Sequence, residues 1–313
     1  MLIYKTIKMN KKLLALIFSV CFIGESISQN LSIFNIGLCR NDSVGLVSLS
    51  DIFQLSEHPD SLAVPDISEN DAASASNFEY LHLEANYRKL FLNKTKISET
   101  NFLFIYDYVS NKLVSLKVKS LKVVACLNIY GADWPYRQYD YMIGFEIDKK
   151  HINIFNKNLS NTLVSFGKEN PFVQGQIKRV NWKKMESKLF PKIPINPIDT
   201  AYVKYNKGIA GNSFSYNTDS LSYFLQEFNI DSVVNFKRLL VLQTKSNKLV
   251  CDRIYYDHES AVLAPITEQF TGNLFKNSPS VIFGFEYGVF ECPRITIINP
   301  TRQDVYLNCD NRH

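Results

Sequence analysis

The chain contains few of the residues that mark fibrous or unstructured proteins. Of its 313 residues only 12 are Gly and 11 are Pro, whereas 46% are hydrophobic. This composition excludes collagen-like, low-complexity and broadly disordered classes, because those chains have too few apolar side chains to bury. At roughly 150 residues per domain, the length predicts about two domains.

A strong excess of one charge is also lacking. The chain has 35 Lys and Arg against 30 Asp and Glu, a formal net charge of +5. Nucleic-acid-binding domains usually carry a clustered basic face, so we expect no nucleic acid among the partners. Long apolar runs are scarce as well. The run at 13–23 is too short for a stable membrane span, and we expect no such span in the mature chain.

The N-terminus has the order of features found in a secretory signal peptide. Lys11 and Lys12 precede the apolar run, and Ser26 and Ser28 offer a signal-peptidase site before Gln29. We therefore expect residues 1–28 to be removed, together with most of the net positive charge. A lipoprotein signal at Cys21 is disfavoured because it would need a small residue just before that cysteine. The sequence thus predicts an exported bacterial protein, located in the periplasm, at the cell surface or outside the cell.

Two cysteines near the C-terminus flank a predicted β-hairpin over residues 294–307, with its turn at 299–302. Cys292 and Cys309 lie equally far from the tip between Pro300 and Thr301. Cross-strand neighbours come within disulfide reach, so we predict a Cys292–Cys309 disulfide. Two buried free thiols are the alternative.

Three further cysteines belong to the mature chain. Cys39 can pair with Cys126 or with Cys251, and one thiol is left over in either case. CxxC pairs and His/Cys patterns with zinc spacing are missing from the sequence. We therefore expect neither a metal site nor a cofactor.

An internal repeat is the most informative pattern. The pentapeptide SNKLV occurs at 110–114 and again at 246–250. Weaker matches follow the same order, pairing 101–102 with 235–236, 144–146 with 284–286 and 152–156 with 295–299. Chance similarity among β-hairpins is the alternative to a duplication.

Each copy is expected to begin with a helix and to continue with hairpin-linked strands. Ser76 and Glu79 resemble a capping box for a helix over 77–92. In the second copy, Asp219 can cap an apolar stripe at helical spacing, formed by Leu221, Phe224, Leu225 and Phe228. We therefore predict an α+β fold of two tandem, internally related domains, each a helix packed on a mainly antiparallel sheet.

The predicted organisation has five parts. They are a signal peptide at 1–28, an N-terminal extension at 29–76, a first domain at 77–190, a linker at 191–197 and a second domain at 198–313. Pro191, Pro194 and Pro197 support the linker, because proline at every third residue prevents a helix and favours an extended spacer.

Motifs of well-known enzyme classes are lacking, among them Gly-x-Ser-x-Gly, the P-loop, Gly-x-Gly-x-x-Gly and His-Glu-x-x-His. The remaining catalytic candidates are Asp257, His258 and Glu259, in which carboxylates would orient a titrating imidazole. Alternate residues of a strand point to opposite faces, so these three consecutive side chains cannot converge on one site without a turn. A solvated loop is therefore favoured over a catalytic site. His58, His82 and His151 are isolated in the sequence and are predicted to be surface residues.

Aromatic and basic segments supply two candidate binding surfaces. Trp134, Tyr136, Tyr139 and Arg137 combine flat apolar area with polar groups, which suits sugar rings or a protein interface. Packing of these rings in the core or against a loop is favoured over such a surface. The basic segment 178–192 has a short apolar stripe, formed by Trp182, Met185 and Leu189. An amphipathic helix at an anionic membrane surface is one interpretation, and a solvated helix, or an extension docked by this stripe onto its own domain, is favoured.

Together these patterns predict an exported, non-enzymatic module that binds a protein or a glycan at the cell envelope. The competing prediction is a secreted hydrolase that uses Asp257, His258 and Glu259.

Overall fold

The computed structural model describes residues 31–39, 44–49, 78–128, 136, 138–155, 159–195, 209–230, 233–256, 268–285 and 292–309. The chain divides into a unit Met1–Leu31 and a unit Ser32–His313. The predicted signal peptide lies outside the described residues. All elements below belong to the second unit.

One sheet has five short antiparallel strands in the order β2-β3-β8-β7-β4. In β7 every residue is buried, so both faces of this sheet are covered at its centre. Its strands are β2 (Gly37–Cys39), β3 (Val44–Ser48), β8 (Tyr141–Ile147), β7 (Val123–Leu127) and β4 (Tyr80–His82).

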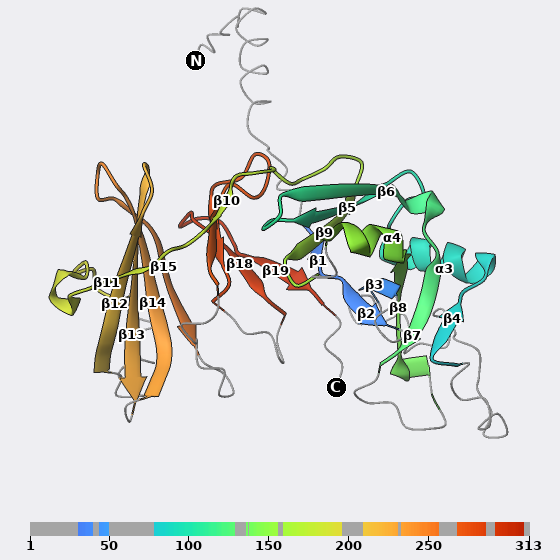
Figure 1. Cartoon of the computed structure of the whole chain (residues 1–313), viewed down its shortest axis with the longest axis horizontal. Helices are drawn as coiled ribbons and strands as arrows, with labels where there is room; N and C mark the ends of the chain where they lie inside the picture. Colours follow the sequence, from blue (N-terminus) through green and yellow to red (C-terminus); the bar gives the residue numbers. More distant parts are fainter. Residues whose placement is uncertain are drawn as a thin grey trace, which may run out of the picture. The chain divides into compact units, whose positions relative to one another are not determined.

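A second sheet has nine strands in the order β10-β16-β17-β18-β19-β1-β9-β5-β6. Strand β1 pairs with β19 in parallel and with β9 in antiparallel orientation, so it joins two groups of strands. The strands are β10 (Ile177–Arg179), β16 (Phe270–Gly272), β17 (Val281–Phe283), β18 (Arg294–Ile297), β19 (Val305–Asn308), β1 (Ile33–Phe34), β9 (Thr162–Gly167), β5 (Phe102–Asp107) and β6 (Lys112–Lys117). Figure 1 shows β5, β6 and β9 side by side.

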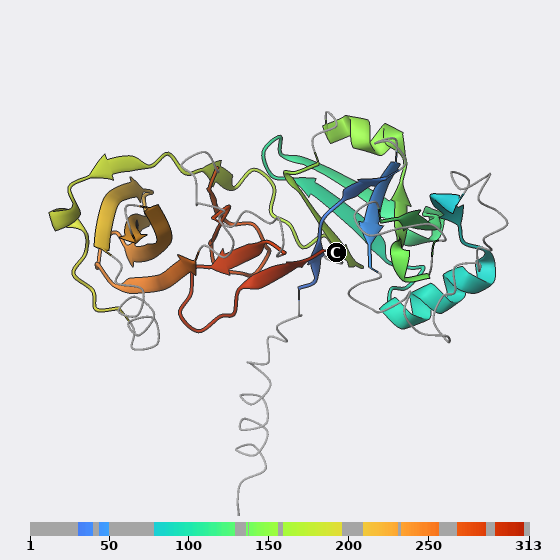
Figure 2. The ribbon, with the colours of Figure 1, turned by 90° about the horizontal axis from the view of Figure 1, so that it is seen from below.

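A third sheet has long strands in the order β11-β12-β13-β14-β15, all antiparallel. Seen from below in Figure 2, its gold and orange strands curl into an arc, as the right-handed twist of long antiparallel strands favours. The strands are β11 (Lys183–Met185), β12 (Ile209–Asn217), β13 (Leu221–Ile230), β14 (Val233–Gln243) and β15 (Leu249–Tyr256).

The first core lies between the sheet of β7 and β8 and the strands β1, β9 and β5. Aromatic rings join the two layers: Phe145 of β8 contacts Phe166 of β9, and Phe166 contacts Phe34 of β1. Helix α3 (Ala85–Thr95) adds Phe91, whose ring meets Phe145 edge-on. The short helix α4 (Lys149–Ile152) adds Ile152. This region, here called the first sandwich, is therefore a pair of sheets with helices at its border.

The second core lies between the third sheet and strands β16 to β18. Two buried hydrogen bonds cross it, from Tyr223 to Thr271 and from Tyr255 to Thr296, each 2.9 Å long. Buried tyrosines find such partners because an unpaired hydroxyl is costly in an apolar interior. We call this region the second sandwich.

The α+β prediction is wrong, because the protein is mostly β, with several sheets. The predicted helix after Asp219 is strand β13. Its apolar stripe is split between two faces: Leu225 lies in the second core, whereas Phe224 contacts Phe190 on the opposite face. In a strand that is covered on both faces, apolar residues no longer alternate strictly with polar ones. Here the apolar residues that remain happen to follow helical spacing. Helix α3 also starts at Ala85 rather than at 77, after strand β4.

The two copies of the repeated pentapeptide form turns with the same backbone conformation. Asn111 and Asn247 have left-handed backbones, with φ of 55° and 53°, in the turns before β6 and β15. Asn adopts this conformation more readily than most residues. The match of 152–156 with 295–299 does not extend to the structure, because 152–155 is helical whereas Arg294–Ile297 is a strand.

The proline-rich segment is bound to the third sheet over its described part. Arg238 of β14 donates to the carbonyl oxygens of Ile193 and Pro194, at 2.8 and 3.1 Å. The predicted domain boundaries stay a prediction.

Two cysteine pairs lie at disulfide distance. Cys292 and Cys309 have Cα atoms 5.7 Å apart, although the hairpin register, Arg294 opposite Tyr306, is shifted by one residue from the predicted one. Cys39 lies 6.4 Å from Cys126 by the same measure, and Cys251 is buried and unpaired. Such pairs are typical of an oxidising, exported environment.

Among the residues that the structure describes, no helix combines the length and apolar character needed to cross a bilayer.

Candidate functional site

The structure places only part of the predicted site residues. Asp257, His258 and Glu259 lie outside the described residues, as do Trp134 and Arg137. Tyr136 is half-buried beside the first core, where its ring meets Tyr141 edge-on. Tyr139 is 45% exposed on the turn Gln138–Asp140. Of the described aromatic candidates, Tyr139 is the exposed one.

The basic segment 178–192 forms no amphipathic helix and is instead a largely extended stretch of chain. It contains strands β10 and β11, which belong to different sheets, and the short 3-10 turn Ser187–Leu189. Trp182 packs against the second core and donates its Nε1 hydrogen to Gln269 at 3.0 Å. The apparent helical stripe is therefore divided, with Leu189 exposed.

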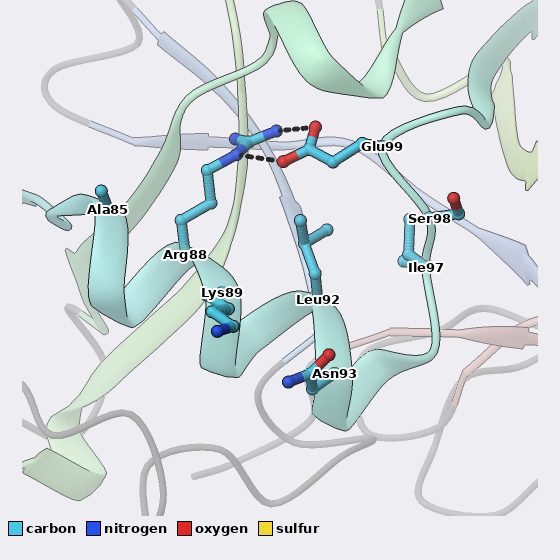
Figure 3. A pocket seen from close by; sticks show the side chains of 8 residues that line it. All are labelled: Ala85, Arg88, Lys89, Leu92, Asn93, Ile97, Ser98 and Glu99. Atoms are coloured by element: carbon cyan, nitrogen blue, oxygen red, sulfur yellow. Dashed lines mark hydrogen bonds and ion pairs between the residues drawn. The ribbon is translucent and has the colours of Figure 1, made fainter.

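A groove lies beside helix α3 (Figure 3). Its volume is about 460 Å³. Leu92 and Ile97 are buried at its floor, whereas Lys89, Asn93 and Ser98 are exposed around it. The groove thus presents a small apolar floor with an ammonium, an amide and a hydroxyl at its border.

The end of helix α3 creates this groove. Lys96 adopts a left-handed conformation, with φ of 57°, and ends the helix. The Thr95 hydroxyl donates to the Phe91 carbonyl at 2.9 Å, which satisfies a carbonyl in the last turn. The chain then runs back along the helix, and the side-chain oxygen of Asn101 accepts a hydrogen bond from the Ser98 amide at 2.9 Å.

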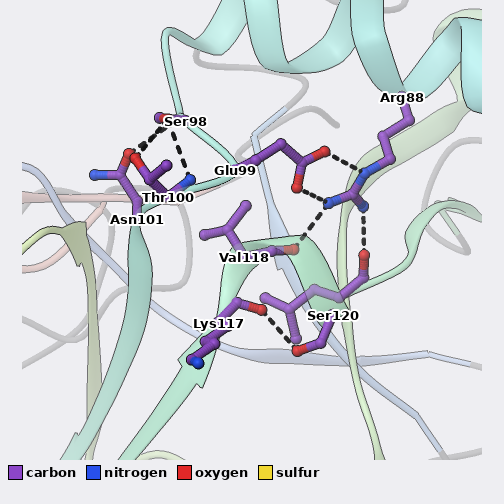
Figure 4. Close-up of polar contacts among 9 residues, drawn as sticks. Arg88, Ser98, Glu99, Thr100, Asn101, Lys117, Val118 and Ser120 are labelled. Atoms are coloured by element: carbon purple, nitrogen blue, oxygen red, sulfur yellow. Dashed lines mark hydrogen bonds and ion pairs between the residues drawn. The ribbon is translucent and has the colours of Figure 1, made fainter.

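Arg88 connects the helix to the returning chain and to the turn after β6 (Figure 4). Its guanidinium makes two hydrogen bonds to the Glu99 carboxylate, at 2.9 and 2.8 Å. It also donates to the carbonyl oxygens of Val118, at 2.8 Å, and of Leu121. The hydrogen bonds from Arg88 hold the pKa of Glu99 below its usual value. Glu99 is therefore an ionised structural partner rather than a proton acceptor.

A second hollow has a volume of about 140 Å³. A hydrogen bond connects the linings of the two hollows, because Arg88, which lines the groove, donates to the carbonyl of Leu121, which lines the second hollow. Acidic and basic side chains dominate the lining, which consists of Leu116, Ser120, Leu121, Lys122, Glu146, Asp148, Lys150 and His151.

The carboxylates of the second hollow are engaged. Glu146 accepts a hydrogen bond from the Tyr80 hydroxyl and lies 3.8 Å from the Lys122 ammonium. Asp148 forms an ion pair with Lys150 at 3.0 Å.

His151 completes this lining. Partial burial and the charge of Lys150 lower the pKa of His151, so its imidazole is mostly neutral at neutral pH. In the described parts of the chain, no group of three or more His, Cys, Asp or Glu side chains is placed to hold a metal ion. The arrangement offers hydrogen-bond donors and cationic groups to a ligand.

Sequence reasoning missed these two hollows. Their residues come from three separate segments, around 85–99, 116–122 and 146–151, and follow no motif spacing. His151 was predicted to be an isolated surface residue, yet the fold brings it beside Lys122 and Glu146.

Comparison with protein-family models, with curated proteins and with solved structures finds no match for this chain.

Proposed function

We propose that this chain is an exported, non-enzymatic binding module of the cell envelope, and that its ligand is a glycan held in the α3 groove and the second hollow. The observation that supports this proposal is the groove itself, in which polar groups of Lys89, Asn93 and Ser98 surround an apolar floor. Sugar rings present hydroxyls at their edges and C–H groups on their faces, so such a border and floor complement them.

The chemistry of the carboxylates supports binding rather than hydrolysis. Glycoside hydrolysis needs two carboxyl groups that flank the bond to be cleaved. In these hollows Glu99 is held by Arg88, and Asp148 is paired with Lys150. The two cysteine pairs support export, because disulfides persist in oxidising compartments. The finer assignment to the periplasm or the cell surface is part of this proposal.

The test is a glycan array probed with the mature chain from Gln29 onward, followed by calorimetry on the best glycan. Asn93→Trp fills the groove and should lower the affinity by about tenfold or more, the order of effect of losing a central contact. Asn217→Trp, at an exposed end of β12, is the matched control and should bind as the wild type does.

Equal affinities for the two variants would overturn the assignment of the groove. Binding of protein partners with no glycan signal would favour the protein alternative. If the glycan were cleaved by the wild type but not by His258→Ala, the hydrolase prediction would replace binding.

A further inference from the structure

Six lysines lie on the segments that line the two hollows, and we call them the lysine edge. Lys89 lines the groove, and Lys122 and Lys150 line the second hollow. All six are exposed, and they come from helix α3, from the end of β6 with the turn after it, and from α4. They are Lys89, Lys117, Lys119, Lys122, Lys149 and Lys150. The mature chain as a whole has little net charge, so the fold gathers here a positive charge that the composition does not reveal.

Hydrogen bonds and the second hollow connect the three segments that carry the lysine edge. Arg88 of α3 donates to the carbonyls of Val118 and Leu121. Leu121 and Lys122 then share the second hollow with Lys150 and His151 of α4. Figure 4 shows Lys117 beside this turn, where its carbonyl accepts the Ser120 hydroxyl at 2.7 Å. The three segments therefore border one connected surface.

Among the described residues of this surface, carboxylates are fewer than cationic groups. Glu99 is bound by Arg88, Glu146 by Tyr80 and Lys122, and Asp148 by Lys150. Glu84 precedes α3 and is exposed.

Four of the lysines have no carboxylate partner among the described residues. Within the described part of the chain, Lys89, Lys117, Lys119 and Lys149 form no ion pair with a carboxylate. The described residues of this surface therefore keep an excess of positive charge after their own ion pairs are formed.

We propose that the ligand of the α3 groove and the lysine edge is an acidic polysaccharide that carries carboxylate or sulfate groups along its chain. This inference rests on the proposed glycan-binding function and names its ligand class. Ammonium groups at separate positions match charges repeated along a polymer, and complementary charge raises both the association rate and the specificity. Asn93, Ser98 and Ser120 supply neutral hydrogen-bond groups between the lysines. An anionic membrane is the less suitable partner, because membrane-bound surfaces usually bury a continuous apolar face.

The experiment measures binding of the mature chain to polygalacturonate, dextran sulfate, neutral dextran, phosphatidylglycerol vesicles and duplex DNA at increasing salt. The edge variant carries Lys89→Glu, Lys119→Glu and Lys149→Glu, three lysines that form no ion pair within the described part of the chain. The control variant carries Lys183→Glu, Lys245→Glu and Lys248→Glu, exposed lysines of the third sheet and its turn with the same change in net charge. Unchanged thermal unfolding shows that both variants fold.

The edge variant should bind the two acidic polysaccharides at least about tenfold more weakly at low salt, and its affinity should depend less on salt. The control variant should stay within about twofold of the wild type, because its lysines are distant charges screened by salt. Equal losses in both variants, or none in either, would overturn the proposal. Stronger binding to vesicles or to DNA than to the polysaccharides would also overturn it.

This outcome is separable from that of the proposed function. If neutral dextran binds and Asn93→Trp weakens it while the edge variant does not, the acidic ligand is wrong and the glycan-binding groove stands. If neither variant changes binding to any glycan, both proposals fail.

Discussion

The ion pairs buried in the third sheet differ from the charges that line the hollows of the first sandwich. In the first sandwich, Lys89, Lys122 and Lys150 line two hollows and are exposed. In the second, charged side chains are buried within the third sheet: Lys237 lies 3.8 Å from Glu227, and Arg238 lies 2.8 Å from Asp252. Charges in contact with water remain available to a ligand, whereas buried charges must be paired within the fold.

The buried pairs of the second sandwich are well supported by hydrogen bonds. Asn212 donates to Glu227 at 2.9 Å, and Arg238 makes hydrogen bonds to Asp252 and to two backbone carbonyls. Burial lowers the pKa of Lys237 despite the opposing effect of Glu227. We infer from the comparison that the first sandwich provides the binding surface and that the second provides rigidity.

The largest effect is expected from Arg238→Ala. This change leaves the Asp252 carboxylate and the carbonyls of Ile193 and Pro194 without their donor. Breaking a buried ion pair costs about 3–5 kcal/mol of unfolding free energy, measurable by urea denaturation. Glycan affinity of the folded variant should be unchanged. A loss below about 1 kcal/mol, as for a surface pair, would break the contrast between the sandwiches.

Removal of the Cys292–Cys309 pair should have the next largest effect. Replacing both cysteines by serine should lower the unfolding free energy by about 2–4 kcal/mol, if the pair is oxidised. Peptide mapping without reductant should find this bridge and the Cys39–Cys126 bridge. Alkylation of Cys292 and Cys309 in the native protein would contradict both statements.

Cys251 supplies the internal control for that mapping. Burial raises the pKa of its thiol to about 12, so the reactive thiolate is scarce at neutral pH. We expect iodoacetamide to label Cys251 only after unfolding. Rapid labelling of the folded chain would show that the second core is open at this point.

Arg88→Ala tests the first sandwich, with a smaller expected loss of about 1.5–3 kcal/mol for hydrogen bonds to a charged group. Because Arg88 links α3 to residues 99, 118 and 121, this variant should also bind glycan more weakly. Arg238→Ala is the matched arginine control. A variant that lost stability but kept full affinity would separate the groove from binding.

The direction in which the pKa of Glu99 is shifted predicts how the stabilising effect of the Arg88–Glu99 pair depends on pH. The pKa of Glu99 is lowered in the folded protein, so its contribution to stability is present above the unfolded pKa and disappears as the pH falls through the folded one. Wild type and Glu99→Gln should therefore differ in melting temperature at neutral pH and converge in acid. A difference in melting temperature between the two proteins that grew as the pH fell would contradict this prediction.

The smallest effect is expected from Tyr223→Phe, which removes one hydrogen bond across the second core. Thr271 keeps a partner, because its hydroxyl donates to the Val281 carbonyl at 2.7 Å. The unfolding free energy should fall by about 0.5–1.5 kcal/mol, with glycan binding unaffected. A loss as large as that of Arg238→Ala would show that this bond is part of a larger network.

Local features of the fold were predictable from the sequence. The hairpin that holds Cys292 and Cys309 follows from its turn residues and flanking isoleucines, and the SNKLV turns follow from an asparagine that tolerates positive φ. These signals lie within a few residues of each other. The error at β13 has a physical cause, since Phe190 covers one face of that strand and the second core covers the other.

The candidate site was not predictable in the same way. Lys89, Lys122 and Lys150 are distant in the sequence, and only the packing of α3 and α4 around the turn after β6 brings them to one surface. Among the aromatic candidates, Tyr136 packs beside the first core and Tyr139 is exposed. The roles predicted for Trp134, Arg137 and the 257–259 segment stay predictions.

Hydrogen–deuterium exchange with and without polygalacturonate tests the central claim most directly. The account predicts ligand-dependent protection over residues 85–99, 116–122 and 146–151, with exchange in β12 to β15 unchanged. Protection of the third sheet, with none along the lysine edge, would show that the second sandwich carries the binding surface and would contradict the account.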